Sequence, residues 1–317
     1  MDTPLWAWAA CIAVIALALA LDLFVFHRHA HEVSLREAAF ASIGWVALGI
    51  SFGVAVWLWG GADSGQEYFA GYLIEKALSV ENVFVFALVL RYFAVPPENQ
   101  HRVLFLGVLG ALILRGGFIA GGKALLDSFH WMIYVFGAFL VLTALRMATQ
   151  DEISVDPARN PLLKALRRVI PMTDEYEGQR FWVRRAGRRM ATPMLAVLVA
   201  VETTDVVFAV DSIPAIFAVT TDTFVVFTSN AFALLGLRAL YFLLAGAMLR
   251  LKYLKAGLAA VLALVGVKML ITDLYKMPIA ISLGAIAAIL TVAITASLWK
   301  AGRTEAPESE SAAERHS

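Results

Sequence analysis

Cysteine and net charge are both scarce in this chain of 317 residues. Cys11 is the only cysteine, so no disulfide and no C-x-x-C pair can form within one chain, which argues against dithiol redox chemistry. A formal net charge of +1 gives no bulk electrostatic reason to expect nucleic acid as a partner. The apolar segments contain no HExxH motif and no Ser/His pair, and we therefore expect no enzyme.

Long apolar runs dominate the chain instead. Hydrophobic residues make up 60% of it, more than is usual in soluble domains, and the mean hydropathy is +0.75. The runs are about 20 residues long, the length that a helix needs to cross a bilayer core. We predict an all-α, polytopic transmembrane bundle of about nine helices. The expected spans are 5–26, 35–59, 68–90, 103–121, 131–149, 191–218, 223–247, 256–273 and 278–299.

The connections between these spans differ in their basic residues. Lys and Arg are abundant in every second connection: the 146–190 loop has ten, whereas the 122–130 loop has only Lys123. By the positive-inside rule, this alternation predicts nine spans with the N-terminus outside and the C-terminus in the cytoplasm. Turn residues are expected to separate spans at Gly60-Gly61, Pro96-Pro97, Gly121-Gly122 and Pro278.

The domain organisation follows from the same pattern. We expect residues 1–300 to form a single transmembrane domain with a solvated cytoplasmic loop at about 150–190. The polar, Glu-rich segment 301–317 predicts a disordered cytoplasmic tail.

Two parts of the chain resemble each other in the order of their charged residues. Each part has an acid, then a second acid six residues later that precedes a small polar residue, then an arginine, then another basic residue. The arginine and the last basic residue are 31 residues apart in the first copy and 30 in the second. The matched residues are Glu75, Glu81, Asn82, Arg115 and Arg146 in the first copy and Asp205, Asp211, Ser212, Arg238 and Lys268 in the second.

The two copies predict an inverted repeat. They cover about 68–149 and about 191–273, which are spans three to five and spans six to eight. Because three is an odd number, the copies must enter the membrane from opposite sides. Many secondary transporters are built this way, with their sites near the midplane at the repeat interface. Chance similarity between apolar helices is the alternative. The acid pair, the arginine and the last basic residue are three charged landmarks in the same order, and they make chance the weaker explanation.

Six carboxylates lie in the predicted spans or at their edges. An acid at the centre of a membrane helix costs about 2.5–3.5 kcal/mol even on insertion scales. Too few basic residues are available to balance all six acids, so either some acids are protonated or a cation binds. For the two arginines, ion pairing with these acids and a direct gating role are both open. The acids are Asp22, Glu75, Glu81, Glu202, Asp205 and Asp211, and the bases are Lys76, Arg115 and Arg238.

Helical spacing predicts how these groups face. Glu75 and Asn82 are seven residues apart and share a helix face, as do their counterparts in the second copy. The second acid of each copy lies about a third of a turn away. Straight helices would therefore point the four acids in two directions, and local unwinding could bring them together. Pro214 favours such a break, because it removes a backbone donor and frees the carbonyl of Val210.

The potential ligands in these motifs are oxygen atoms from carboxylates, the Ser212 hydroxyl, the amides of Asn82 and Asn230, and freed backbone carbonyls. Such ligands suit Mg²⁺, Ca²⁺ and Mn²⁺, whereas Zn²⁺ and copper prefer nitrogen and sulfur. Away from these motifs, His27, His29 and His31 alternate along the first cytoplasmic loop. The simpler interpretation is a solvated polar loop, and the alternative is a weak patch that captures metal ions.

These motifs resemble the TerC family of membrane proteins, and most closely its Alx-type members. The resemblance rests on 71–84 (GYLIEKALSVENVF) and 201–220 (VETTDVVFAVDSIPAIFAVT), with 228–230 (TSN) and 237–242 (LRALYF) extending it. It covers nearly the whole chain outside the tail. The first motif departs from the family at Glu81, where the family usually has Asp, and the Glu side chain is longer by one methylene.

The resemblance implies a nine-helix protein of the bacterial inner membrane that is linked to Mn²⁺ export, with the transported metal in place of any cofactor. It also implies that the six acids form the metal pathway. Alx-type proteins have in addition been labelled redox modulators. With the helical faces considered above, the candidate ligands are Asp22, Glu75, Glu81, Asn82, Glu202, Asp205, Asp211 and Ser212, and the supporting or gating residues are Lys76, Arg115, Arg238, Asn230 and Pro214.

Three functions are compatible with these features. The favoured one is a divalent-cation exporter that works by alternating access, in which protons on the same carboxylates could exchange for the metal. The second is a membrane-bound redox modulator, against which the single Cys11 argues. The third is a stress-response scaffold of the tellurium-resistance type that recruits partners through the 150–190 loop, and it leaves the buried acids unexplained. The residues do not separate Mn²⁺ from Ca²⁺ or Mg²⁺, and the resemblance alone favours Mn²⁺.

Overall fold

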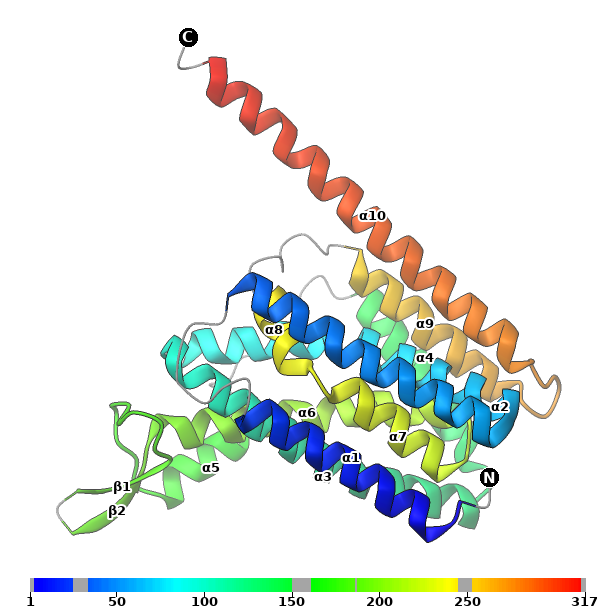
Figure 1. Ribbon diagram of the computed structural model, residues 1–317, viewed down its shortest axis with the longest axis horizontal. Coiled ribbons are helices and arrows are strands. Elements are labelled where there is room, and N and C mark those ends of the chain that lie inside the picture. Colours follow the sequence, from blue (N-terminus) through cyan, green and yellow to red (C-terminus); the bar gives the residue numbers. More distant parts are fainter. Residues whose placement is uncertain (1–2, 25–33, 150–160, 186, 245–252, 315–317) are drawn as a thin grey trace.

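The computed structural model describes residues 3–24, 34–149, 161–185, 187–244 and 253–314, and helix dominates these ranges (Figure 1). A two-stranded antiparallel hairpin is formed by β1 (Trp182–Arg185) and β2 (Arg188–Ala191). The helices are α1 (Leu5–Phe24), α2 (Leu35–Tyr92), α3 (Pro97–Ser128), α4 (Met132–Thr149), α5 (Pro161–Val169), α6 (Pro193–Phe217), α7 (Thr223–Leu234), α8 (Leu237–Leu244), α9 (Leu254–Leu270) and α10 (Ile279–Glu314).

Every predicted span corresponds to a helical segment in the described ranges. Seven helices there are long and apolar enough to cross a membrane, with α7 and α8 together counted as one. Helix α2 supplies two spans, because Gly61 has a φ of 87° and a ψ of 175° and reverses the chain. Its two halves pack on each other, and the Tyr68 hydroxyl donates to the Gly49 carbonyl at 2.9 Å. Helix α9, with 17 residues, is slightly shorter and supplies span eight.

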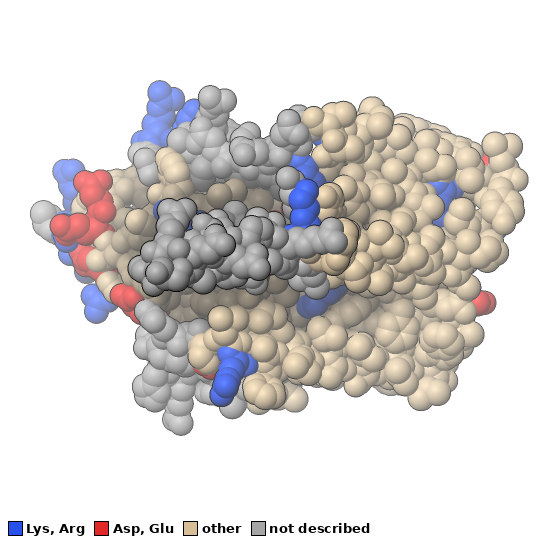
Figure 2. Space-filling view, turned by 90° about the horizontal axis from the view of Figure 1, so that it is seen from above, with Lys and Arg blue, Asp and Glu red and all other residues tan. Residues whose placement is uncertain are grey.

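The chain alternates between two ends of the bundle. One end, which we call the N-terminal end, holds the start of α1 and the bend in α2, where the rings of Trp6 and Trp59 lie 5.6 Å apart. The other, the hairpin end, holds β1, β2 and the start of α3, where the Asn99 amide donates to the Gly178 carbonyl at 3.2 Å. Figure 2 shows acidic and basic side chains gathered at the hairpin end, which is the end that the basic loops predict to be cytoplasmic.

The sides of the bundle are apolar on the outside as well as within. Large hydrophobic side chains project outward from helices at its periphery, an arrangement that suits contact with lipid rather than water. Examples are Phe40, Ile43, Ile113, Leu142 and Val292, each more than 60% exposed.

The two predicted repeats pack as an inverted pair. The second half of α2 begins at the N-terminal end and α6 ends there, and the Thr220 hydroxyl after α6 donates to Glu67 of α2 at 2.7 Å. The first helices of the two copies, α2 and α6, contact each other, as do the third helices, α4 and α9; α3 packs on α6, and α7 packs on α2. Exchanging the two copies leaves this set of contacts unchanged, as a pseudo-twofold relation requires.

The middle helices of the two copies differ. Helix α3 is continuous over 32 residues, whereas α7 ends at Leu234 and α8 begins at Leu237. Gly236 lies at this interruption with a φ of 84°, and a Cβ there would be 2.5 Å from the Cβ of Trp45. Both the backbone conformation and the available space therefore require glycine.

One predicted turn differs from the structure. Gly121 and Gly122 do not end a helix, because α3 continues to Ser128. A Cβ on Gly122 would lie 2.8 Å from the Phe217 ring, so this glycine allows α3 to approach α6 closely. Helix α10 continues past span nine to Glu314, and disorder of the 301–317 tail stays a prediction.

The described part of the 150–190 loop folds against the hairpin end, while residues 150–160 and the histidine run at 27–31 lie outside the described residues. The Tyr176 hydroxyl donates to the Phe93 carbonyl at 2.7 Å, and burial raises the pKa of Tyr176 to about 12. Arg185 donates to Glu175 at 3.1 Å and to Glu177 at 2.8 Å, and these hydrogen bonds raise the pKa of its guanidinium.

We expect Gly236→Ala to destabilise the protein by roughly 1–3 kcal/mol, because alanine disfavours a positive φ and its Cβ would collide with Trp45. Thermal unfolding of the purified protein in detergent measures this loss. Gly284→Ala in α10 is the matched control, because a Cβ there meets nothing within 4 Å. Its midpoint should stay unchanged or rise slightly. Equal midpoints for the two variants would contradict the described interruption.

Candidate functional site

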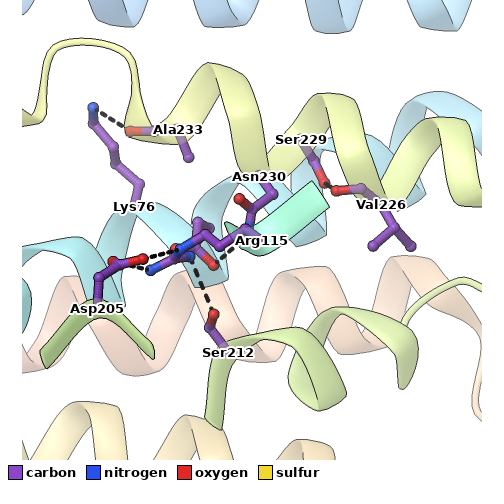
Figure 3. A network of polar contacts seen from close by, with 9 residues as sticks. Lys76, Arg115, Asp205, Ser212, Val226, Ser229, Asn230 and Ala233 are labelled. Carbon is purple, nitrogen blue, oxygen red and sulfur yellow. Dashed lines mark hydrogen bonds and ion pairs between the residues drawn. The ribbon is translucent and has the colours of Figure 1, made fainter. Parts of the chain in front are cut away.

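One guanidinium lies where the two copies meet in the middle of the bundle (Figure 3). Arg115 of α3 is 1% exposed, and Glu75 of α2 and Asp205 of α6 are both 0% exposed. Arg115 donates to the two carboxylate oxygens of Asp205, from Nε at 3.3 Å and from Nη2 at 3.0 Å. Its Nη1 donates to Glu75 and, at 3.2 Å, to the hydroxyl of Ser212. The first acids of both copies therefore share one base.

Two buried amides complete this cluster. The Asn230 amide of α7 donates to the second oxygen of Glu75 at 3.0 Å. With its amide oriented so that the oxygen faces Arg115, Asn82 accepts from Nη2 at 3.2 Å and donates to the Leu78 carbonyl at 3.1 Å. The face that spacing predicts for the first acid and the small polar residue of each copy is thus found on both helices, and both faces converge on Arg115.

The second acids of the two copies lie outside the hydrogen bonds of Arg115. The charges of Asp211 and Lys255 act on Glu81, and the charge of Arg146 acts on Asp211. The Thr143 hydroxyl of α4 donates to Asp211 at 3.1 Å. Both acids are partly exposed, unlike those around Arg115. The four acids therefore point in two directions, as straight helices predict.

The expected break at Pro214 is absent. Helix α6 is continuous from Pro193 to Phe217 with Pro214 inside it. Pro214 leaves one carbonyl, that of Val210, without its helical donor, and the backbone nevertheless stays helical to Phe217, with the Ala218 N–H donating to the Pro214 carbonyl at 3.0 Å. The acids are consequently brought together by the crossing of α2 and α6 and by Arg115, and not by a local loss of helix.

Glu202 occupies the interface between α6 and α3. Its carboxylate lies directly over Gly110, where any Cβ would overlap it. The buried Oε2 atom of Glu202 forms a hydrogen bond with none of the residues that the structure describes. Asp205, one turn further along α6, is close enough to act on it electrostatically. Glu202 is thus a partly buried acid whose side chain still has an acceptor to offer.

The other predicted bases lie away from the Arg115 cluster. Arg238 of α8, the counterpart of Arg115, forms an ion pair with Asp22 of α1 and donates to its carbonyl at 3.1 Å. Lys76 donates to the Ala233 carbonyl at 3.1 Å, at the C-terminal end of α7. Its ammonium thus lies where the end of a helix favours a cation. Ion pairing with acids is therefore observed for both arginines, each with a different set of carboxylates.

The central cluster has more acids than bases. Two carboxylates face one guanidinium, and when both carboxylates are ionised the cluster carries a net negative charge, which is costly in a low-dielectric interior. Within the described ranges, no group of three or more Asp, Glu, His or Cys side chains is arranged to hold a metal ion. Oxygen atoms that suit a hard cation therefore lie in the middle of the bundle, and the guanidinium of Arg115 binds them.

Several residues around these groups were not predicted from the sequence. Thr143 and Gly110 act through neighbours on other helices, which spacing along one helix cannot show.

A cavity of about 1260 Å³ opens at the N-terminal end. In the sequence, the acids at the edges of the apolar runs were the feature that could have indicated this cavity. Its charged lining residues are Glu67, Lys123, Asp222, Lys268 and Lys276.

Fold and site together define a polytopic membrane protein whose two inverted repeats enclose a buried cluster of charges. The family described as "Integral membrane protein TerC family" matches residues 60–305. The chain belongs to this family.

Named relatives agree with this assignment. The membrane protein STKORF319 of Myxococcus xanthus is 49% identical over 270 residues, which cover 85% of each chain. The Alx protein of Salmonella typhi is 49% identical over 277 residues, 85% of this chain and 86% of the relative, and that of Escherichia coli K12 is 47% identical with the same coverage. The names of both Alx proteins describe them as candidate membrane-bound redox modulators. No solved structure matches the chain.

The charge balance of the cluster predicts different costs for removing its members. Arg115→Gln leaves two buried carboxylates without their cation, and we expect a loss of roughly 3–5 kcal/mol in unfolding free energy. Asp205→Asn leaves one carboxylate with one guanidinium, and the expected loss is about 1 kcal/mol. Thermal unfolding in detergent gives the order of the two variants. An Asp205→Asn loss as large as that of Arg115→Gln would contradict the proposed balance.

Proposed function

We infer that the protein transports a divalent metal cation, with Mn²⁺ as the favoured substrate, out of the cytoplasm across the bacterial inner membrane. The single observation that supports this most is the buried cluster of Glu75 and Asp205 at the interface of two inverted repeats. Intramembrane acids in such a position are costly and mark ion pathways. Transporters built from inverted repeats bind their substrates at this interface.

The chemistry of the cluster suits a hard cation. Glu75, Asp205, the Ser212 hydroxyl and the Asn82 amide oxygen contact the Arg115 guanidinium. The Asn230 amide binds Glu75 beside them. Oxygen ligands favour Mn²⁺, Mg²⁺ and Ca²⁺ over Zn²⁺. Family membership favours Mn²⁺ among these, by the resemblance given above. The metal is cargo in this account, and no resident cofactor, chemical reaction or nucleic acid is part of it.

The transport cycle uses the relation between the two copies. Mn²⁺ enters from the hairpin end, which we assign to the cytoplasm, loses part of its hydration shell and binds Glu75 and Asp205. Glu81 of α2 and Glu202 of α6 lie between the hairpin end and these two acids, whereas Asp211 lies on the N-terminal-end side of Asp205. Rocking of one copy against the other then opens the site toward the cavity at the N-terminal end, which we assign to the outside. Protons that return on the same carboxylates complete the cycle, because a protonated carboxylate binds cations poorly.

A redox function is the second candidate, and the names of the Alx relatives favour it. Thiol chemistry in this chain would have to use Cys11, which is 2% exposed and packed in the hydrophobic core. A buried cysteine behaves as a small apolar residue, whereas reactive cysteines are exposed and lie in positively charged surroundings. We therefore favour transport.

Cells that express the protein under Mn²⁺ load should retain less manganese than cells without it. Glu75→Gln and Asp205→Asn should each slow efflux by about tenfold, the effect of weakening a ligand by about 1.4 kcal/mol. Asp127→Asn is the matched control, because this acid of α3 is 60% exposed and pairs with Lys123. Elemental analysis of Mn, Ca, Mg and Zn measures both the efflux and its selectivity. Unchanged manganese efflux in both site variants would refute the assignment.

Cys11→Ala should leave manganese efflux and metal resistance at the level of the unchanged protein, because the thiol contributes only packing. Growth under Mn²⁺ load and cellular manganese content measure this. Loss of resistance with manganese efflux intact would instead favour the redox function.

A further inference from the structure

The guanidinium of Arg115 occupies the place that a metal would need. It binds both oxygens of Asp205 at 3.0 and 3.3 Å and also binds Glu75. A cation that binds these carboxylates directly would meet the same oxygens and, in a low-dielectric interior, strong repulsion from the guanidinium. The metal and the present position of Arg115 therefore exclude each other.

A vacant acceptor lies one turn away from this position. Glu202 precedes Asp205 by three residues, which is about 4.5 Å along the helix axis. Its buried Oε2 atom has no hydrogen-bond partner among the described residues. A buried carboxylate oxygen without a donor is unfavourable, so the site would gain from an incoming guanidinium.

The packing of α3 and α6 places this acceptor on the side toward which Arg115 extends. The helices run in the same direction: Gly107 faces Val201, Gly110 faces Glu202, and Arg115 binds Asp205 further along both. Side chains on a helix tilt toward its N-terminus, and for Arg115 this is the direction of Gly110 and Glu202. Glu202 faces Gly110 of α3 and Asp205 binds Arg115 of α3, so both carboxylates lie on the face of α6 that α3 covers. A change in the rotamer of Arg115 would carry its guanidinium from Asp205 toward Glu202, one turn back along this face.

The charges of the four groups match a divalent ion. Glu75, Asp205 and Glu202 with Arg115 carry a net charge of two negative units when all four are ionised. One divalent cation on Glu75 and Asp205, with Arg115 on Glu202, leaves the set neutral. A monovalent cation would leave one negative charge buried, which is unfavourable in a membrane interior.

We propose that Arg115 is an internal competitor that the arriving metal displaces from Glu75 and Asp205, and that Glu202 is the positioning residue that receives its guanidinium. This inference rests on the proposed metal transport. The return of Arg115 to Glu75 and Asp205 expels the metal when the site opens outward. Glu202 thus acts on the metal through Arg115 and not as a ligand.

A double-mutant cycle tests this assignment. Mn²⁺ alone is titrated into purified full-length protein in lipid nanodiscs, and free Mn²⁺ is followed by electron paramagnetic resonance. Arg115→Gln should bind Mn²⁺ at least about tenfold more tightly than the unchanged protein, because the competitor is gone. Glu202→Gln should weaken binding by about tenfold in the presence of Arg115 and have no effect in the Arg115→Gln background.

The outcomes separate this proposal from the proposed function. If the unchanged protein fails to bind Mn²⁺, the proposed function fails. If it binds, but Glu202→Gln weakens binding equally in both backgrounds, Glu202 is a ligand and the present proposal is overturned. Weaker or unchanged binding in Arg115→Gln overturns it as well, because a purely structural arginine would not compete.

Arg115→Lys is a second variant that keeps the proposal testable if Arg115→Gln does not fold. It retains a positive charge, but a single ammonium cannot hold two oxygens of Asp205 and one of Glu75 in the geometry of a guanidinium. Mn²⁺ should therefore bind this variant more tightly than the unchanged protein and less tightly than Arg115→Gln. Binding at or below the strength of the unchanged protein would overturn the proposal.

Discussion

The rest of the site depends on the burial of two carboxylates from different repeats around one guanidinium. Glu75, Asp205 and Arg115 lie on three helices, and their charges can be tolerated inside the bundle only in each other's presence. This requirement fixes the crossing of α2 and α6 and the close approach of α3. Gly107 and Gly110 permit that approach, since a Cβ at either position would meet α6 side chains at less than 3 Å.

The two copies use equivalent residues differently, and this difference gives the repeat a direction. Arg115 lies on a continuous α3 and reaches the central acids, whereas Arg238 follows the interruption at Gly236 and is held by Asp22 of α1. Transporters with inverted repeats alternate between states in which the copies exchange their conformations. The middle helix is continuous in one copy (α3) and interrupted in the other (α7 and α8). One such state would show this difference between the copies.

The spans and the repeat could be predicted from the sequence because both depend on local features. The length of an apolar run and the order of charged landmarks are visible along the chain, and seven-residue spacing correctly places Glu75 with Asn82 on one face. Which acid meets which base could not be predicted, because it depends on how separate helices cross. Gly122 and Pro214 were misinterpreted for a related reason. Glycine serves both turns and close helix contacts, and proline near a helix end need not break the helix.

The central claim is that buried carboxylates at the repeat interface carry a divalent cation across the membrane. The most direct test reconstitutes purified protein into liposomes that contain a dye quenched by Mn²⁺, and adds Mn²⁺ outside. The account predicts quenching that requires the protein and that disappears when Glu75→Gln and Asp205→Asn are combined. Quenching at the rate of protein-free liposomes, or at the same rate with and without the two substitutions, would contradict it.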